Sequence, residues 1–104
     1  MDYANKVVAI TGGARGIGLA MAQAFHARGA RIALADLDGA ETAAETFDGL
    51  GMTVDVAVDG QVAEFIQKTE AVLGPIDVYV SNAGVLMTDE PSWDAAGATD
   101  ANWQ

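Results

Sequence analysis

The sequence contains no cysteine, one histidine and only five basic residues. Without cysteine the chain cannot form a disulfide, a thiolate metal site or a cysteine nucleophile, and a single histidine cannot build a zinc site by itself. Fifteen acidic residues against five basic ones give a formal net charge of −10, whereas nucleic acids and anionic membranes require clustered Lys and Arg. We therefore expect no metal site, no nucleic acid partner and no membrane partner.

Long apolar runs are also missing. Residues 1–6 do not show a charged segment followed by an apolar one, and no apolar run approaches the length of a membrane span. The default expectation for location is therefore the cytoplasm. The composition is nevertheless 51% hydrophobic over 104 residues, which is sufficient for one small packed domain.

The most informative stretch is the glycine-rich segment 11–18, TGGARGIG, which follows an apolar run and leads into a helical apolar pattern. This arrangement places backbone N–H groups and a helix N-terminus at the end of a buried strand, where a phosphate binds well. Gly12 permits a sharp turn, Gly16 lets the backbone approach a pyrophosphate, and Gly18 lets the helix pack closely. A tight strand-to-helix turn can also require glycine without any ligand, so the segment alone is weak evidence.

Apolar patterns and turn residues predict alternating strands and helices along the chain. Strands are expected at 6–10, 30–35, 52–58 and 76–80, and helices at 17–28, 40–50 and 61–73. Such alternation produces right-handed crossovers and a parallel sheet. The expected fold class is therefore α/β, an incomplete doubly wound parallel sheet of Rossmann type with strand order 3-2-1-4.

Two motifs together resemble the short-chain dehydrogenase/reductase family of classical type. The first is the spacing T-G-x-x-x-G-x-G near the N-terminus, and the second is Asn82-Ala83-Gly84 after the expected fourth strand. Ser81 stands where the family more often has asparagine, which is a conservative departure. The resemblance covers nearly the whole chain, but only the N-terminal part of a family whose members are about twice as long or more.

The resemblance implies a dinucleotide site in the crevice where the strand order reverses. Its residues are expected to come from the glycine turn, from the ends of the second and third strands, and from the Asn-Ala-Gly motif. They are Gly12, Arg15, Gly16, Ile17, Gly18, Asp36, Leu37, Asp55, Val56, Asn82, Ala83 and Gly84.

Asp36 ends the expected second strand, about 20 residues beyond the glycine turn. An acid at this position accepts hydrogen bonds from the adenosine ribose hydroxyls, and its charge repels a 2′-phosphate. The alternative is that Asp36 and Asp38 are only turn formers that open a helix. Arg15 could assist a phosphate, but one arginine does not outweigh the acid. We therefore predict NAD as the cofactor in preference to NADP.

An acid followed by an apolar residue at the close of the third strand resembles the family's adenine-contacting position. Asp55-Val56 fits best, because its distance to Gly74 matches the family pattern. Asp59 stays open as the alternative, since apolar alternation at 54, 56 and 58 could carry the strand further.

The catalytic residues that the resemblance implies are missing from this chain. The family uses a tyrosine and a lysine in Y-x-x-x-K, together with a serine that orients the carbonyl group. Here a lysine follows Tyr3 at the wrong spacing, and no lysine follows Tyr79. No catalytic residue is therefore predicted, and the 104 residues alone are expected to be inactive.

Residues 85–104 have the character of a loop, ending in the first turn of a helix that stops as it begins. We therefore expect residues 1–104 to be the dinucleotide-binding portion of a single Rossmann domain in a longer NAD-dependent oxidoreductase. The complete enzyme would act on a small alcohol or ketone, and it would form homo-oligomers only as a complete chain. The alternative is a non-catalytic nucleotide-binding or interaction module.

Overall fold

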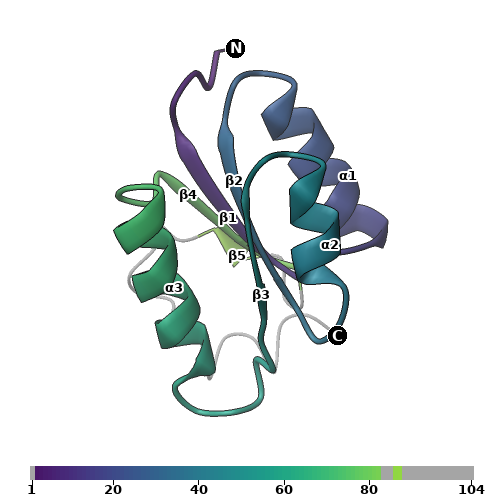
Figure 1. Ribbon diagram of the computed structural model, residues 1–104, viewed down its shortest axis with the longest axis vertical. Coiled ribbons are helices and arrows are strands. Elements are labelled where there is room, and N and C mark those ends of the chain that lie inside the picture. Colours follow the sequence, from purple (N-terminus) through teal and green to yellow (C-terminus); the bar gives the residue numbers. More distant parts are fainter. Residues whose placement is uncertain (1, 83–85, 88–104) are drawn as a thin grey trace.

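Four parallel strands form the centre of the computed structural model, which describes residues 2–82 and 86–87. β1 (Val7–Thr11) lies between β2 (Arg31–Asp36) and β4 (Val78–Ser81). β3 (Leu50–Thr53) pairs with the outer side of β2 (Figure 1). The α/β class and the strand order 3-2-1-4 are thus confirmed.

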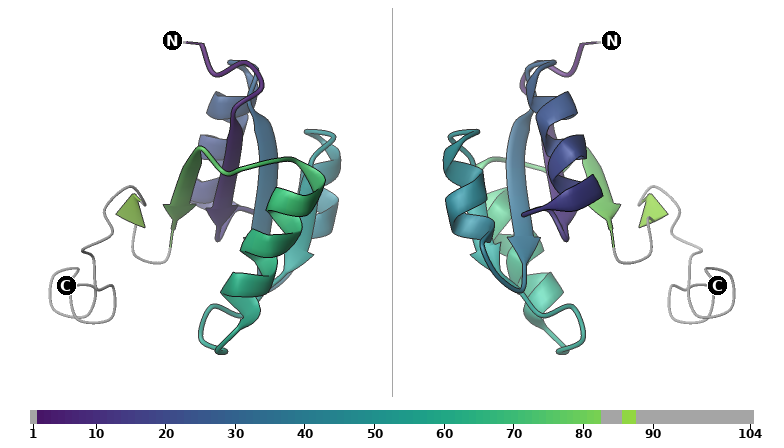
Figure 2. Two further views of the ribbon diagram at one scale, coloured as in Figure 1. Left: turned by 90° about the vertical axis from the view of Figure 1, so that its left-hand side faces the viewer. Right: turned by 90° about the vertical axis from the view of Figure 1, so that its right-hand side faces the viewer.

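Helices cover both faces of this sheet (Figure 2). α1 (Gly16–His26) and α2 (Ala40–Glu45) lie on one face, and α3 (Gln61–Val72) lies on the other. The core divides accordingly, because successive strand residues point to opposite faces. Val8 and Ile10 pack on the side of α1 and α2, whereas the small Ala9 lies on the side of α3 with the fully buried Phe65.

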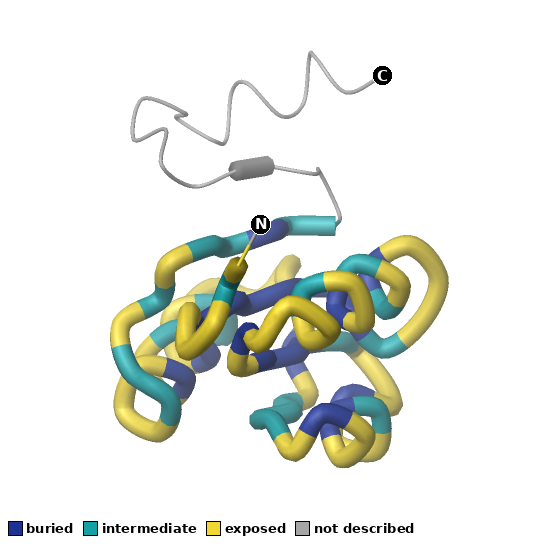
Figure 3. The backbone as a smooth tube through the Cα atoms, turned by 90° about the horizontal axis from the view of Figure 1, so that it is seen from above, coloured by how far each residue is buried: buried dark blue, intermediate teal, exposed yellow. Residues whose placement is uncertain are grey.

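β1 is buried along its whole length, as its uniformly apolar sequence predicts for a strand covered on both faces (Figure 3). The last residue of β1 pairs with residues near the carboxyl ends of both neighbouring strands: Thr11 pairs with Ala35 of β2 and with Ser81 of β4. The carboxyl ends of these three strands therefore meet at one edge of the sheet, where the connections to the next elements begin.

The expected helix at 40–50 is wrong in its second half. α2 ends at Glu45, Asp48 adopts a positive φ of 54°, and β3 starts at Leu50. The physical reason is that Gly49 and Gly51, which have no side chain, let this segment lie directly against β2 and α2. An added Cβ at Gly51 would collide with the Ala40 carbonyl oxygen.

The expected third strand at 52–58 is also displaced, since β3 covers 50–53. The apolar alternation beyond it does not continue the strand, and Val56 and Val58 are 49% and 44% exposed.

One further strand lies inside the segment expected to be a loop. β5 (Leu86–Met87) pairs antiparallel with the end of β4. The expected helix turn near the end of the chain lies outside the described residues. Among the helices that are described, none combines the length and apolarity needed to cross a membrane.

Candidate functional site

The glycine turn between β1 and α1 is fastened to the end of β2. The N–H groups of Gly12 and Gly13 both donate to the Ala35 carbonyl oxygen, at 2.7 and 3.2 Å. Gly12 has a φ of 69° and Gly16 a φ of 61°, a region that L side chains rarely adopt. Both positions therefore need glycine for the backbone path itself.

Three glycines in this turn have different surroundings. A Cβ at Gly18 would collide with the Gly12 carbonyl oxygen, so α1 packs directly on the turn. A Cβ at Gly12 would come within 3.0 Å of Asn82 Cβ, whereas one at Gly16 would meet nothing within 4 Å. Gly16 therefore borders open space, which is the property expected of a backbone that a ligand approaches.

A fourth glycine, Gly13, also fits closely. A Cβ there would lie 2.7 Å from Leu34 Cδ2. The sequence pattern predicts no role for this residue, because its requirement comes from a side chain on the neighbouring strand.

The N-terminus of α1 differs from those of the other helices. None of the three described helices has a side-chain hydrogen bond at its N-cap, but the first turn of α1 contains no acidic residue, whereas Glu41 and Glu64 stand in the first turns of α2 and α3. The positive end of the α1 dipole is therefore not neutralised by its own sequence, which favours an anion beside Gly16.

Asp36 connects the glycine turn to the end of β2. Its Oδ2 accepts a hydrogen bond from Ala14 N at 3.0 Å, and its Oδ1 accepts one from Leu37 N at 2.7 Å. The Arg15 guanidinium lies 3.9 Å from Oδ1, and the side chains of Arg15 and Asp36 are 71% and 10% exposed. Asp36 is thus a shielded carboxylate, and Arg15 is a mostly solvated cation beside it.

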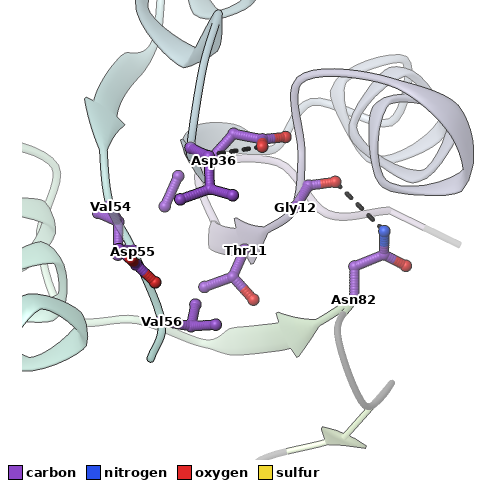
Figure 4. A pocket seen from close by; sticks show the side chains of 9 residues that line it. Thr11, Gly12, Asp36, Val54, Asp55, Val56 and Asn82 are labelled. Atoms are coloured by element: carbon purple, nitrogen blue, oxygen red, sulfur yellow. Dashed lines mark hydrogen bonds between the residues drawn. The ribbon is translucent and has the colours of Figure 1, made fainter. Parts of the chain in front are cut away.

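A cavity of about 220 Å³ opens at the carboxyl edge of the sheet (Figure 4). Its walls come from the ends of β1 and β2, from the segment after β3, and from the residue after β4. The lining residues are Thr11, Gly12, Ala35, Asp36, Leu37, Val54, Asp55, Val56 and Asn82.

Six of the expected site residues therefore meet in one cavity: Gly12, Asp36, Leu37, Asp55, Val56 and Asn82. Four others lie beside it in the turn and the start of α1: Arg15, Gly16, Ile17 and Gly18. Among these, Ile17 is 70% exposed. Ala83 and Gly84 fall outside the described residues.

Three lining residues, Thr11, Ala35 and Val54, are absent from the set expected from the sequence. Thr11 and Ala35 are paired with each other at the ends of their strands, and Val54 directly follows β3. The signal that could have found them is their position at the strand ends, where cofactor crevices of open α/β sheets lie.

Asn82 joins β4 to the glycine turn. Its backbone N–H donates to the Thr11 carbonyl oxygen at 3.1 Å, and its Nδ2 donates to the Gly12 carbonyl oxygen at 3.3 Å (Figure 4). The amide side chain therefore holds the first residue of the turn from the side opposite β2.

The wall after β3 is organised by Asp55. Asp55 N donates to Gln61 Oε1 at 2.7 Å, and Asp55 Oδ1 accepts from Ala57 N at 2.9 Å. Asp55 lines the cavity, whereas the exposed Asp59 is not among the lining residues.

Tyr79 lies on the α3 side of the sheet and is not among the residues that line the cavity. Burial raises the pKa of its phenol, and the Thr11 hydroxyl on the same face offsets only part of this increase. Tyr79 therefore stays protonated at neutral pH and is unsuited to act as a base there. Across residues 2–82 and 86–87, no group of three or more His, Cys, Asp or Glu side chains is placed to hold a metal ion.

A family model described as short chain dehydrogenase matches residues 6–104. The chain belongs to the short-chain dehydrogenase family. The resemblance drawn from the two motifs is therefore confirmed.

Several curated members of the short-chain dehydrogenase family are similar to this chain. Galactitol 2-dehydrogenase of Agrobacterium fabrum is 41% identical over 90 residues, which cover 83% of this chain and 35% of that protein. The 2-dehydro-3-deoxy-L-rhamnonate dehydrogenase (NAD(+)) of a Sphingomonas species is 34% identical over 95 residues, covering 88% and 38% of the two chains.

A solved structure of similar fold, the crystal structure of gox2181, has a TM-score of 0.68 and 30% identity. The match covers 77% of this chain and 34% of that one. The chain thus spans about a third of the length of the short-chain dehydrogenases that it matches.

Proposed function

We propose that this chain is the NAD-binding part of an enzyme that transfers a hydride between NAD and an alcohol or carbonyl substrate. When bound, the nicotinamide supplies the hydride chemistry. The observation that carries the proposal is the position of Asp36, a shielded carboxylate that both lines the cavity and adjoins the open glycine turn.

The residues of the turn fit a pyrophosphate. Gly16 borders open space, and the N-terminus of α1 offers backbone N–H groups with no acidic residue in the first turn. These two features supply what an anion needs in a chain of net charge −10: a local positive field made by backbone dipoles.

The residues of the cavity fit an adenosine group. Asp36 supplies carboxylate oxygens for the ribose hydroxyls, and Asp55 supplies one on the opposite wall for the adenine amino group. The exposed Val56 adds apolar surface on which the adenine ring can lie. The charge of Asp36 disfavours the 2′-phosphate of NADP, which supports NAD.

The catalytic step requires residues beyond these 104. The sequence contains no Y-x-x-x-K, and burial raises the pKa of Tyr79 where a catalytic tyrosine needs a lowered one. We therefore expect the purified 104-residue chain to produce no NADH from a panel of secondary alcohols. NADH formation above that of a heat-treated sample, followed at the nicotinamide absorbance, would contradict this expectation.

Cofactor preference tests the central assignment. In the full-length protein we expect NADH to bind at least about tenfold more tightly than NADPH, because the 2′-phosphate would face Asp36. The Asp36→Ala variant should lose most of this preference, and Asp38→Ala, which removes the same charge from an exposed neighbour, should keep it. Tighter binding of NADPH by the unaltered protein, measured by fluorescence titration, would overturn the assignment.

A further inference from the structure

The hydrogen bonds of Asp36 point to a second role for this residue. Its bond from Leu37 N is local, because the two residues are adjacent in sequence. Its bond from Ala14 N joins residues 22 apart and connects β2 to the middle of the glycine turn. A residue whose only task is to accept from a ligand has no need for this second contact.

The turn consists of a fastened half and an open half. Gly12, Gly13 and Ala14 all donate their N–H groups to the last two residues of β2, which are Ala35 and Asp36. From Arg15 onward no backbone N–H of the turn donates to β2. The Arg15 guanidinium lies 3.9 Å from Asp36 Oδ1 but its side chain is 71% exposed, and a Cβ added at Gly16 would meet no atom within 4 Å. The Asp36–Ala14 bond is therefore the last fastening before the open half.

We propose that Asp36 is a positioning residue for the glycine turn, which it holds in its phosphate-binding shape before a dinucleotide arrives. This role rests on the proposed function and adds to ribose binding. The two roles are compatible, because an ionised carboxylate has about four acceptor positions and the backbone uses two of them. Ribose hydroxyls can bind to the others without displacing Ala14.

The carboxylate is better suited to this task than an amide. Each oxygen of Asp36 accepts from one N–H group, so both must be acceptors. Asparagine has only one acceptor oxygen, and its NH₂ group would face an N–H donor at the other contact. Asp36→Asn keeps the shape of the side chain, but it removes one acceptor and also the charge that lies beside the Arg15 guanidinium.

Amide hydrogen exchange in the full-length protein without cofactor tests this role. In Asp36→Ala we expect the Ala14 amide to exchange about tenfold faster or more, as the loss of a hydrogen bond to a charged acceptor predicts. In Asp36→Asn the single acceptor oxygen can serve only one of Ala14 N and Leu37 N, so we expect faster exchange at one of these two amides. The amides of Ile10 and Leu34, which lie in the strands, should be unchanged. In the charge-matched control Asp38→Asn, the Ala14 amide should exchange as in the unaltered protein.

Two results of this experiment would overturn the proposal. One is unchanged exchange at Ala14 in both Asp36 variants. The other is an equal increase at Ala14, Ile10 and Leu34, because Asp36 would then stabilise the whole sheet and have no specific effect on the turn.

A second measurement asks whether the fastened turn matters for phosphate binding. Inorganic pyrophosphate has no ribose, so its affinity reports the turn alone. Asp36→Ala and Asp38→Ala each remove one negative charge, and we expect the former to bind pyrophosphate several-fold more weakly than the latter. Equal affinities of the two variants would show that Asp36 does not prepare the turn for phosphate.

These outcomes are separable from the fate of the proposed function. Faster exchange at Ala14 in a protein that binds neither NADH nor NADPH would support the positioning role and refute NAD binding. Unchanged exchange at Ala14 in a protein that prefers NADH would refute the positioning role and support NAD binding.

Discussion

The two walls of the cavity are built in different ways. The glycine-turn wall is held by hydrogen bonds to other strands, between residues 22 apart for Asp36–Ala14 and 70 apart for Asn82–Gly12. The wall after β3 is joined to the sheet at its first residue, where Val54 N donates to the Asp36 carbonyl oxygen at 2.8 Å. Beyond Val54 its hydrogen bonds are local, between residues 2 and 6 apart for Asp55 with Ala57 and with Gln61. The first wall therefore takes its shape from the sheet, whereas the second, beyond Val54, takes its shape mainly from local hydrogen bonds.

This difference predicts that substitutions in the first wall affect stability as well as binding. The largest effect is expected for Gly18→Ala, because the new Cβ would collide with the Gly12 carbonyl oxygen, a backbone atom that cannot rotate away. We expect a loss of about 3 kcal/mol in the free energy of unfolding and a loss of NADH binding. Chemical denaturation of the full-length protein measures the first; a midpoint within error of the unaltered protein would refute the close packing.

Gly16→Ala and Gly60→Ala form a matched pair at the starts of α1 and α3. Both glycines have positive φ, 61° and 90°, and neither has an atom within 4 Å of an added Cβ. Each substitution should therefore cost about 1 kcal/mol in stability through backbone strain alone. Only Gly16→Ala should weaken NADH binding, by about tenfold or more, since its Cβ occupies the space that the pyrophosphate needs. Equal effects of the two variants on the NADH dissociation constant would contradict the placement of the phosphate.

The smallest effect is expected in the second wall. Asp55→Asn keeps an oxygen for Ala57 N but loses the acceptor for the adenine amino group, which should weaken NADH binding about fivefold. Asp59→Asn serves as the control, because Asp59 is exposed and does not line the cavity. A larger loss of NADH affinity in Asp59→Asn than in Asp55→Asn, measured in the same titration, would show that Asp59 and not Asp55 contacts the adenine.

The accuracy of the sequence predictions follows the same division. The glycine turn and the end of β2 are predictable because backbone geometry there demands particular residue types: Gly12 and Gly16 need positive φ, and Asp36 follows an apolar strand. The family motif then locates Asn82, whose amide contacts the Gly12 carbonyl oxygen.

The region from α2 to α3 is less predictable, because local patterns there are ambiguous. Gly49 and Gly51 are typical of the end of a helix, yet a Cβ at either would collide with backbone of β2 or α2, which no local pattern reveals. The alternation at 54, 56 and 58 resembles a strand, although only Val54 is buried. Pairing with a neighbouring strand, and not alternation, determines where β3 ends.

The long-range bond between Asn82 and Gly12 has a consequence for how the protein folds. Among the described strands β1 comes first in the sequence, and its partner β4 follows only after the residues of α1, β2, α2, β3 and α3. Closing so large a loop is entropically costly, and proteins dominated by such distant pairings fold slowly. During synthesis one edge of the hydrophobic strand β1 therefore stays unpaired until β4 has been made. The cavity is complete only when Asn82 contacts the glycine turn.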